Sequence, residues 1–307
     1  MPGNVEEAIF FLRDGEFEKA KTIFSLLLDG APQDETWKAG YYISSFWDNK
    51  LDHLLSLSEG KERGKALLNY LDLFETEIVS RKFPRDTILQ TALQCVLEEA
   101  IHHLRISFRM EGWNGLDLSS LKGLSICHLR LGEFSQALEI LEPISKSSMQ
   151  SSEYGYLIAE CYLGTGLMDD GKNLYLHSFL DDPLRFNRQC NFWTDLQLIC
   201  QEIDSTQMDG ESKSFAIPVL GLRRGIFRNQ KPKKKQDLDH WMDQMIRLNH
   251  FQNTQTAKFQ KKTAWRTQAF ALSVLENFSE RDYPNEINRT KRFLDESNSI
   301  LNGELPQ

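Results

Sequence analysis

Apolar residues recur every three to four positions along much of the chain, which is the spacing of one face of an α-helix. The nine prolines fall mainly between such segments, and proline interrupts helices. The pattern therefore predicts an all-α protein. The clearest predicted long helices are residues 34–57, 64–80, 85–110, 237–251, 256–278 and 285–301.

Two stretches of ten residues are nearly the same. "GEFEKAKTIF" begins at Gly15 and "GEFSQALEIL" begins at Gly132, and a third glycine, Gly166, follows Gly132 after 34 residues. Glycine tolerates the positive φ with which many helices end. Each of these glycines therefore predicts the turn of a helix–turn–helix unit.

A period of 34 residues with two helices in each unit resembles the tetratricopeptide repeat. In that family a small residue lets two helices approach closely, and a nearby aromatic or apolar residue fills the groove beside it. The matching positions, with each turn glycine first, are Gly15, Ala20 and Phe24, then Gly132, Ala137 and Leu141, then Gly166, Gly171 and Tyr175. Gly171 departs from the expected alanine, and His128 stands where tyrosine is common. The long interval between Gly15 and Gly132 predicts an irregular unit within the repeat.

Composition and charge change after residue 203. Residues 1–203 carry 19 Lys and Arg against 31 Asp and Glu, whereas residues 222–266 carry 12 against 3. Such an asymmetry often accompanies a change of domain. We therefore expect a tetratricopeptide-like solenoid at 1–203, a polar and then basic linker at 204–235, and a helical module or solenoid cap at 236–307. Within the linker, the apolar stretch "FAIPVLGLRRGIF" is compatible with an extended path across the solenoid.

The resemblance implies a site as well as a fold. In this family the first helix of each unit lines a concave groove, where Arg and Lys bind carboxylates and Tyr offers broad contact. The implied partner-binding residues are Arg13, Lys38, Tyr42, Lys122, Arg130, Tyr156 and Glu160. The chain is thereby expected to be a non-catalytic adaptor or scaffold that binds another protein and helps assemble a larger complex, without a cofactor.

The basic segment 223–235 supports an alternative. With Lys233, Lys234 and Lys235, it is suited to nucleic acid or another anionic surface. A nucleic-acid-binding domain usually has a strongly basic balance, whereas this chain has a pI near 5.5. The same strip can instead complement the acidic solenoid of its own chain. The helix at 256–278, with Trp265, Phe270, Val274 and Phe278, is likewise either a docking surface or a core helix, and its spacing favours the core.

Motifs for chemistry are sparse. Glu99 and His102 form half of a carboxylate-bridged metal motif, which needs a second Glu-x-x-His, and no metal is expected. None of the common catalytic or phosphate-binding motifs is present, so no enzyme activity is expected. The five cysteines contain no C-x-x-C pair and are interpreted as free thiols, with Cys127 and Cys161 packed in the core.

The targeting signals are equally sparse. The first residues, "MPGNVEEAIFFL", lack a basic region, and no apolar stretch reaches 18 residues. A signal peptide and a membrane span are therefore not expected, and the cytoplasm is the predicted location. The sequence leaves the oligomeric state open.

Overall fold

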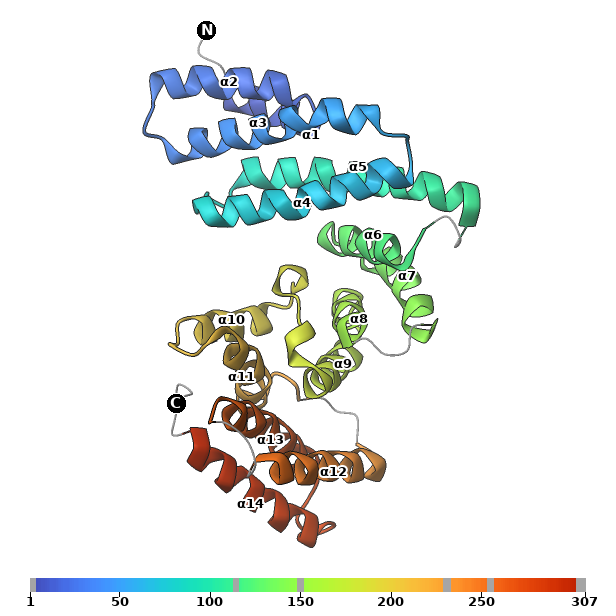
Figure 1. Cartoon of the computed structure of the whole chain (residues 1–307), viewed down its shortest axis with the longest axis vertical. Coiled ribbons are helices and arrows are strands. Elements are labelled where there is room, and N and C mark those ends of the chain that lie inside the picture. Colours follow the sequence, from blue (N-terminus) through green and yellow to red (C-terminus); the bar gives the residue numbers. More distant parts are fainter. Residues whose placement is uncertain (1–3, 113–115, 148–151, 229–232, 253–256, 302–307) are drawn as a thin grey trace. The chain divides into compact units, whose positions relative to one another are not determined.

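Helices account for the regular secondary structure of the computed structural model, which describes residues 4–112, 116–147, 152–228, 233–252 and 257–301 (Figure 1). Within these residues there is no β-strand, so the all-α prediction is confirmed. The six long helices predicted from the apolar spacing are all present. The chain divides into two compact units, Met1–Ile140 and Leu141–Gln307.

The first unit consists of long helices that pack in adjacent pairs. They are α1 (Val5–Arg13), α2 (Phe17–Gly30), α3 (Glu35–Ser56), α4 (Lys61–Arg81), α5 (Thr87–Glu111) and α6 (Leu118–Arg130), and α7 (Phe134–Ser147) begins here and continues past the boundary. The closest pairs are α2 with α3 and α4 with α5. Helix α1 also packs on α5, whereas a strict solenoid pairs each unit only with its neighbours. The irregularity expected in this region therefore extends to how its helices pack.

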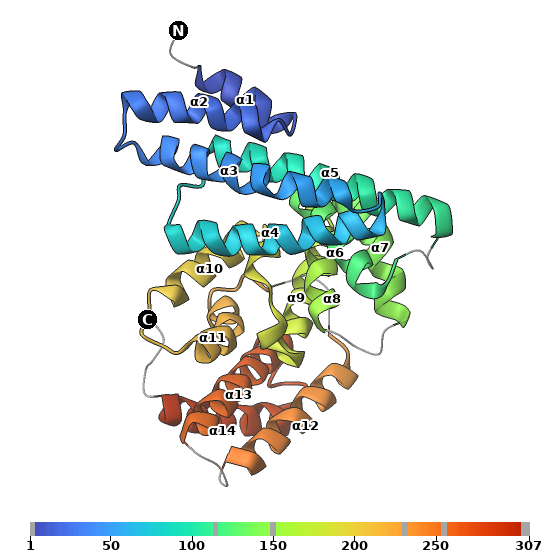
Figure 2. The ribbon, with the colours of Figure 1, turned by 45° about the horizontal axis from the view of Figure 1, so that its top comes forward.

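The second unit is built around α13. Its helices are α8 (Ser152–Gly164), α9 (Met168–Asp181), α10 (Thr194–Asp204), α11 (Gly210–Arg223), α12 (Lys235–Gln252), α13 (Ala257–Asn277) and α14 (Pro284–Leu301), with short 3₁₀ turns η2 (Pro183–Arg185) and η3 (Arg188–Cys190). Helix α13 contacts α9, α11, α12 and α14 (Figure 2). One hydrophobic core joins residues from Tyr156 to Leu301. Trp265, Phe270 and Val274 are buried in it, which confirms the core interpretation of this helix.

The turn glycines have the backbone conformation that the repeated motif predicts. Their φ angles are +74° at Gly15, +76° at Gly132 and +86° at Gly166. In each turn the glycine N–H donates three residues back, and the following N–H donates five residues back, which is the Schellman arrangement. Three nearly identical turns in the chain therefore explain why the same glycine-led sequence recurs.

Close helix contact explains the departure at Gly171. A methyl group at this position would lie 2.6 Å from Cγ of Leu163, inside the contact between α8 and α9. Alanine, which the repeat pattern calls for, therefore does not fit here. Gly40 has the same function between α2 and α3, because the ring of Phe24 lies against it.

Part of the segment expected to be a linker, 204–235, is a buried helix. Residues Gly210–Arg223 form α11, and every side chain from Phe215 to Leu222 is buried. Pro218 removes one helical hydrogen bond, and interior proline usually costs about 3 kcal/mol. Burial of the surrounding apolar side chains in the core offsets this cost, and Gly221 makes room for the ring of Phe227. The two compact units divide at residue 140, whereas the sequence predicts a domain boundary at 203.

Two further sequence-based expectations can be compared with the described residues. Cys127 and Cys161 are fully buried, as the core interpretation predicted, and all five cysteines are free thiols. Among the described helices, none has the length and apolar character needed to cross a membrane.

Candidate functional site

Two of the predicted binding residues, Lys38 and Tyr42, lie on α3 beside α4. Helix α3 begins with a defined cap, because the side chain of Asp34 accepts hydrogen bonds from the N–H groups of Thr36 (2.8 Å) and Trp37 (3.2 Å). Lys38 and Tyr42 follow at one-turn spacing and therefore share one face of the helix. Lys38 lies 2.8 Å from Glu35, at the surface.

Helix α4 runs antiparallel to α3 (Figures 1 and 2). Its last turns reach Tyr42. The Tyr42 hydroxyl donates to Glu77 (3.1 Å), and Nε of Arg81 donates to the same carboxylate oxygen (3.2 Å). The Arg81 guanidinium lies 4.2 Å from the centre of the Tyr42 ring, in a cation–π contact. The ring of Phe83 packs against Tyr42 at 5.4 Å. We call these five residues, Lys38, Tyr42, Glu77, Arg81 and Phe83, the Tyr42 patch.

The Tyr42 patch combines a protonated phenol with a partly exposed cation. Burial raises the pKa of Tyr42, and the hydrogen bond to Glu77 acts in the same direction, so the phenol keeps its proton at neutral pH. Arg81 remains about half exposed, with side-chain accessibility of 48%. The patch thus presents an ordered tyrosine and a cation held in position by neighbours, and Tyr and Arg are enriched at binding hot spots.

Sequence reasoning identified Lys38 and Tyr42 but missed the α4 half of this patch. Glu77 and Arg81 are four residues apart on one helix, a spacing that indicates an ion pair. This spacing can be recognised in the sequence, but it does not indicate that the ion pair contacts Tyr42. The meeting depends on the register of α3 against α4, which the sequence does not specify.

Three other predicted groove residues of the first unit lie on α1 and α6. Arg13 is exposed at the end of α1, and its guanidinium lies 5.1 Å from the ring of Phe10. Lys122 is half-buried on α6. Arg130 is largely buried and forms an ion pair with Glu75 of α4, so its guanidinium already has a partner inside the fold. The structure thus keeps Arg13 at the surface but gives Arg130 a structural contact.

Tyr156 and Glu160 differ from the expectation that they line an exposed groove. They are only 3% and 2% exposed, because α9 and the segment before α10 cover this face of α8. The Tyr156 hydroxyl donates to the carbonyl of Asp182 (3.0 Å). Glu160 accepts from the Tyr175 hydroxyl and from the backbone N–H of Phe192 (3.1 Å). Both residues are therefore core contacts in this structure and not surface contacts.

Glu160 is a buried carboxyl group with an unusual proton affinity. Burial raises its pKa to about 7, and the hydrogen bonds from Tyr175 and from the backbone at the start of α10 oppose this shift only in part. The N-terminus of α10 has no side-chain cap of its own. The Glu160 carboxylate instead fixes the backbone that leads into this helix. Glu160 therefore joins α8, α9 and α10.

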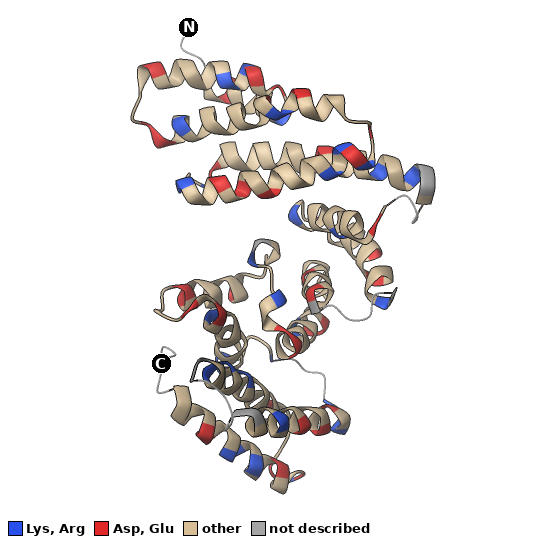
Figure 3. Cartoon of the chain, in the orientation of Figure 1, with Lys and Arg blue, Asp and Glu red and all other residues tan. Residues whose placement is uncertain are grey.

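Two arginines of the basic segment form ion pairs with acidic residues of their own unit. Arg224 lies 2.7 Å from Glu202, and Arg228 lies 2.8 Å from Glu276. Lys233 is half-buried, bonds to Asn173 and lies 5.7 Å from the centre of the Trp241 ring. Residues 229–232 of the segment lie outside the described part, while Lys234 and Lys235 are exposed. Arg224 thus pairs with an acidic residue of the segment expected to be the solenoid, whereas Arg228 pairs within the expected helical module and Lys233 contacts two uncharged side chains. Figure 3 shows acidic and basic residues interspersed on these helices.

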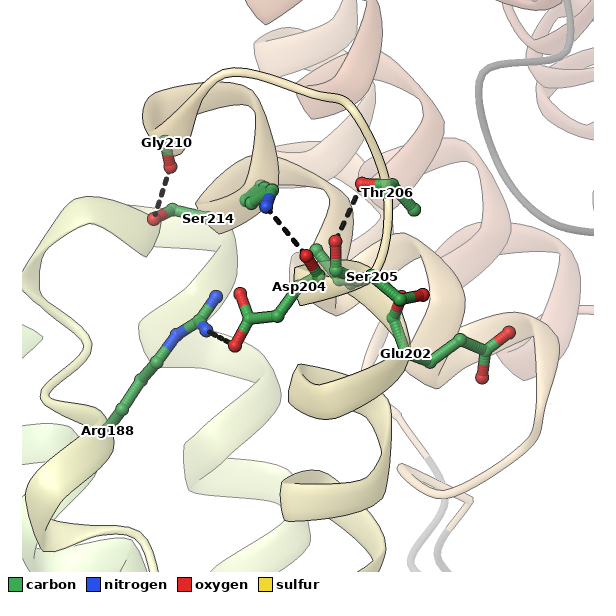
Figure 4. Close-up of polar contacts among 9 residues, drawn as sticks. Arg188, Glu202, Asp204, Ser205, Thr206, Gly210 and Ser214 are labelled. Atoms are coloured by element: carbon green, nitrogen blue, oxygen red, sulfur yellow. Dashed lines mark hydrogen bonds and ion pairs between the residues drawn. The ribbon is translucent and has the colours of Figure 1, made fainter. Parts of the chain in front are cut away.

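An ion pair and several hydrogen bonds also stabilise the turn after α10. Arg188 lies 2.5 Å from the carboxylate of Asp204, and the Lys213 amine donates to the Asp204 carbonyl at 3.0 Å (Figure 4). The Thr206 hydroxyl donates to the carbonyl of Ile203, and the Ser205 hydroxyl donates to that of Glu202 (both 2.6 Å). These contacts satisfy carbonyls at the end of α10, which would otherwise lack partners. The polar stretch expected to be a loose linker is an ordered helix-to-helix connection.

Glu99 does not pair with His102. Its carboxylate lies 3.1 Å from Nε2 of His103, one helical turn away, and His103 is buried while His102 is exposed. Burial lowers the pKa of His103, so its imidazole is neutral at physiological pH. Among the described residues, no group of three or more His, Cys, Asp or Glu side chains is arranged to hold a metal ion.

Comparison with known proteins gives no relative: no family model, no curated protein and no solved structure matches the chain. The fold class therefore rests on the helices themselves. They define an all-helical protein whose helices pack in adjacent pairs.

Proposed function

We propose that this chain is a non-catalytic adaptor that binds another protein through the Tyr42 patch and helps a larger complex assemble. The observation that carries the proposal is the ordered contact of Tyr42 with Glu77 and Arg81 at the surface of α3 and α4. Because these side chains are already fixed before binding, less conformational entropy is lost when a partner associates. A partner segment with carboxylates would complement Lys38 and Arg81. The helical pairing and the resemblance to the tetratricopeptide repeat support a scaffold of repeated helix pairs.

The buried titratable groups support binding over catalysis. Glu160 is committed to Tyr175 and the start of α10, and His128 lies 2.5 Å from Glu133 in the turn after α6. Burial lowers the pKa of His128, so it is neutral at physiological pH. Each group therefore has a structural partner that explains its position.

The test is quantitative affinity enrichment from native lysate with the full chain as bait. Lys38→Glu combined with Arg81→Glu reverses both positive charges of the Tyr42 patch. Lys146→Glu is the matched control, because Lys146 is 78% exposed on α7 and lies outside the patch. We expect at least one protein to be recovered equally by the native chain and the control, and at least about tenfold less by the double variant.

Equal recovery by all three baits, or no enriched protein with any of them, would contradict the proposal. The lysate is divided and one half is treated with nuclease. Loss of recovery after that treatment would move the function to nucleic acid and away from the patch.

A further inference from the structure

Aromatic rings and a further cation continue along α3 and α4 beyond the Tyr42 patch. Phe46 lies one turn after Tyr42 on α3, and the two ring centres are 6.3 Å apart. Lys50 follows one turn later, and its amine lies 5.7 Å from the centre of the Phe46 ring and 5.0 Å from that of Tyr70 on α4. The Tyr70 hydroxyl lies 2.9 Å from Nδ1 of His53. We call Tyr42, Phe46, Lys50, His53 and Tyr70 the aromatic strip.

The aromatic strip is accessible to a ligand. Phe46, Lys50 and Tyr70 are half-buried, and His53 is exposed. Within the described residues the Lys50 amine donates no hydrogen bond, and it is not one of the buried polar atoms that lack a partner, so it reaches solvent. Leu73, one turn after Tyr70 on α4, is 45% exposed. A partner can therefore contact the Lys50 amine and an apolar surface next to it.

Lys50 lacks the acidic neighbour that the other cations of this surface have. Glu35 lies 2.8 Å from Lys38, and Glu77 accepts a hydrogen bond from Arg81. In the described part of the chain no carboxylate lies within ion-pair distance of Lys50, and its contacts are with ring faces. A ring face positions an ammonium group but leaves its outward hydrogens available to an acceptor. A carboxylate from another molecule would therefore complement Lys50.

We propose that the aromatic strip binds an acidic segment of the partner protein, in which an apolar residue lies between two carboxylate groups. One carboxylate contacts Arg81 beside Tyr42, and the other contacts Lys50, two turns further along α3. Two such turns rise by about 12 Å, a distance that an extended peptide covers in about four residues. The apolar residue between the carboxylates rests on Phe46 and Leu73. The inference rests on the proposed function, because it names the chemistry of the partner that the Tyr42 patch binds.

Fluorescence polarisation of a labelled peptide with the full chain tests the proposal. The split peptide has seven residues, with two acidic residues at each end and a central phenylalanine between two serines. One control peptide has the same composition with all four acidic residues at one end, and another has amides in place of the carboxylates. Lys50→Met removes the charge but keeps an apolar side chain over the rings. Lys146→Met is the matched control, because Lys146 is 78% exposed on α7.

We expect saturable binding of the split peptide, with a Kd on the order of 0.1–1 mM. Lys50→Met should weaken this binding by at least about threefold, and the one-ended peptide should bind more weakly by a similar factor. Lys146→Met should leave the affinity unchanged, and the amide peptide should not bind. Equal affinity for the two acidic peptides, no effect of Lys50→Met, or no saturable binding would overturn the proposal.

A strand of nucleic acid suits this surface less well, because it carries a phosphate at every nucleotide and the aromatic strip offers one cation without an acidic neighbour. Tighter binding of a ten-nucleotide oligothymidylate than of the split peptide would overturn the proposal. Lysate enrichment with Lys50→Met as an added bait separates this inference from the proposed function. A protein lost with the Lys38→Glu and Arg81→Glu bait but fully retained by Lys50→Met would overturn this inference alone.

Discussion

Lys82 ends α4 in a backbone conformation that glycine adopts elsewhere in the chain. Its φ is +57°, and among the described residues it is the non-glycine position with positive φ. Its backbone bonds match those of the glycine turns, with Lys82 N–H donating to Val79 and Phe83 N–H donating to Ile78. The left-handed region costs a residue with a Cβ about 1–2 kcal/mol.

Lys82→Gly should therefore raise the free energy of unfolding by roughly 0.5–1 kcal/mol, after allowing for the greater entropy of glycine in the unfolded chain. Gly132→Ala is the matched reverse change and should lower it by about 1 kcal/mol, because nothing lies within 4 Å of the added methyl group and only the backbone is strained. Urea unfolding of both variants measures the effects. Shifts of the same sign at the two positions would show that the turns are not equivalent.

Glu160 predicts a dependence of stability on pH. Its pKa is about 7 in the folded chain, compared with about 4.3 for an unfolded glutamate. The folded chain therefore binds more protons between these values, and its free energy of unfolding falls as pH rises through that window. We expect a loss of roughly 2 kcal/mol between pH 5 and pH 8 from this group.

Glu160→Gln removes that loss while keeping an oxygen that can accept from Phe192. The difference in unfolding free energy between the native chain and the variant should therefore change by this amount across the window. His103, His128 and His177, whose pKa values are lowered by burial, contribute equally to both chains and cancel. Glu59→Gln is the control, because Glu59 is 71% exposed. A parallel pH profile for the Glu160 variant would contradict this origin.

At the scale of the element, α11 shows where tertiary packing overrides local sequence. Pro218, Gly221 and Gly225 are residues that usually end helices, and they led to the expectation of an extended connection. The structure instead buries the helix from Phe215 to Leu222 against α10 and α13. Gly225 does end it, with φ +70° and the same bonds as the other glycine turns.

Hydrogen exchange can separate these two views of α11. If it is a core helix, the amides of Ile217, Val219 and Leu220 should exchange at least about 100-fold more slowly than those of an exposed connection, close to the slowest amides of the unit. Pro218 has no backbone N–H and therefore gives no exchange signal. Exchange at the rate of the unfolded chain would show that the segment is a linker after all.

The sequence predicts features that depend on neighbouring residues, such as the helices and the glycine turns. It does not predict features that depend on contacts between residues far apart in the sequence. The long helices follow from apolar spacing, and the turns at Gly15, Gly132 and Gly166 follow from backbone geometry. Tyr156 and Glu160 were placed on a surface because their positions in the helix permit it. Only the packing of α9 and the segment before α10 shows that they are covered, and no feature near these residues in sequence reveals that.

At the scale of the whole molecule, the compact units predict which fragments fold. Residues 141–307 contain the entire second core, whereas a cut at 203 removes Tyr175, Phe179 and Trp193 from it. Fragment 141–307 should therefore unfold cooperatively with heat. Fragment 204–307 should lose that cooperativity and expose apolar surface, measured by calorimetry and dye binding. Equal cooperativity in both fragments would restore the boundary at 203.

The central claim, that the Tyr42 patch contacts a partner protein, is tested most directly by site-specific crosslinking. A photo-reactive amino acid replaces Lys38 in the full chain, produced in its native cells, and a second chain carries it at Lys146 as the control. The account predicts a discrete covalent adduct with another protein from position 38, which weakens when Arg81→Glu is added. No adduct from position 38, or the same adduct from position 146, would contradict it.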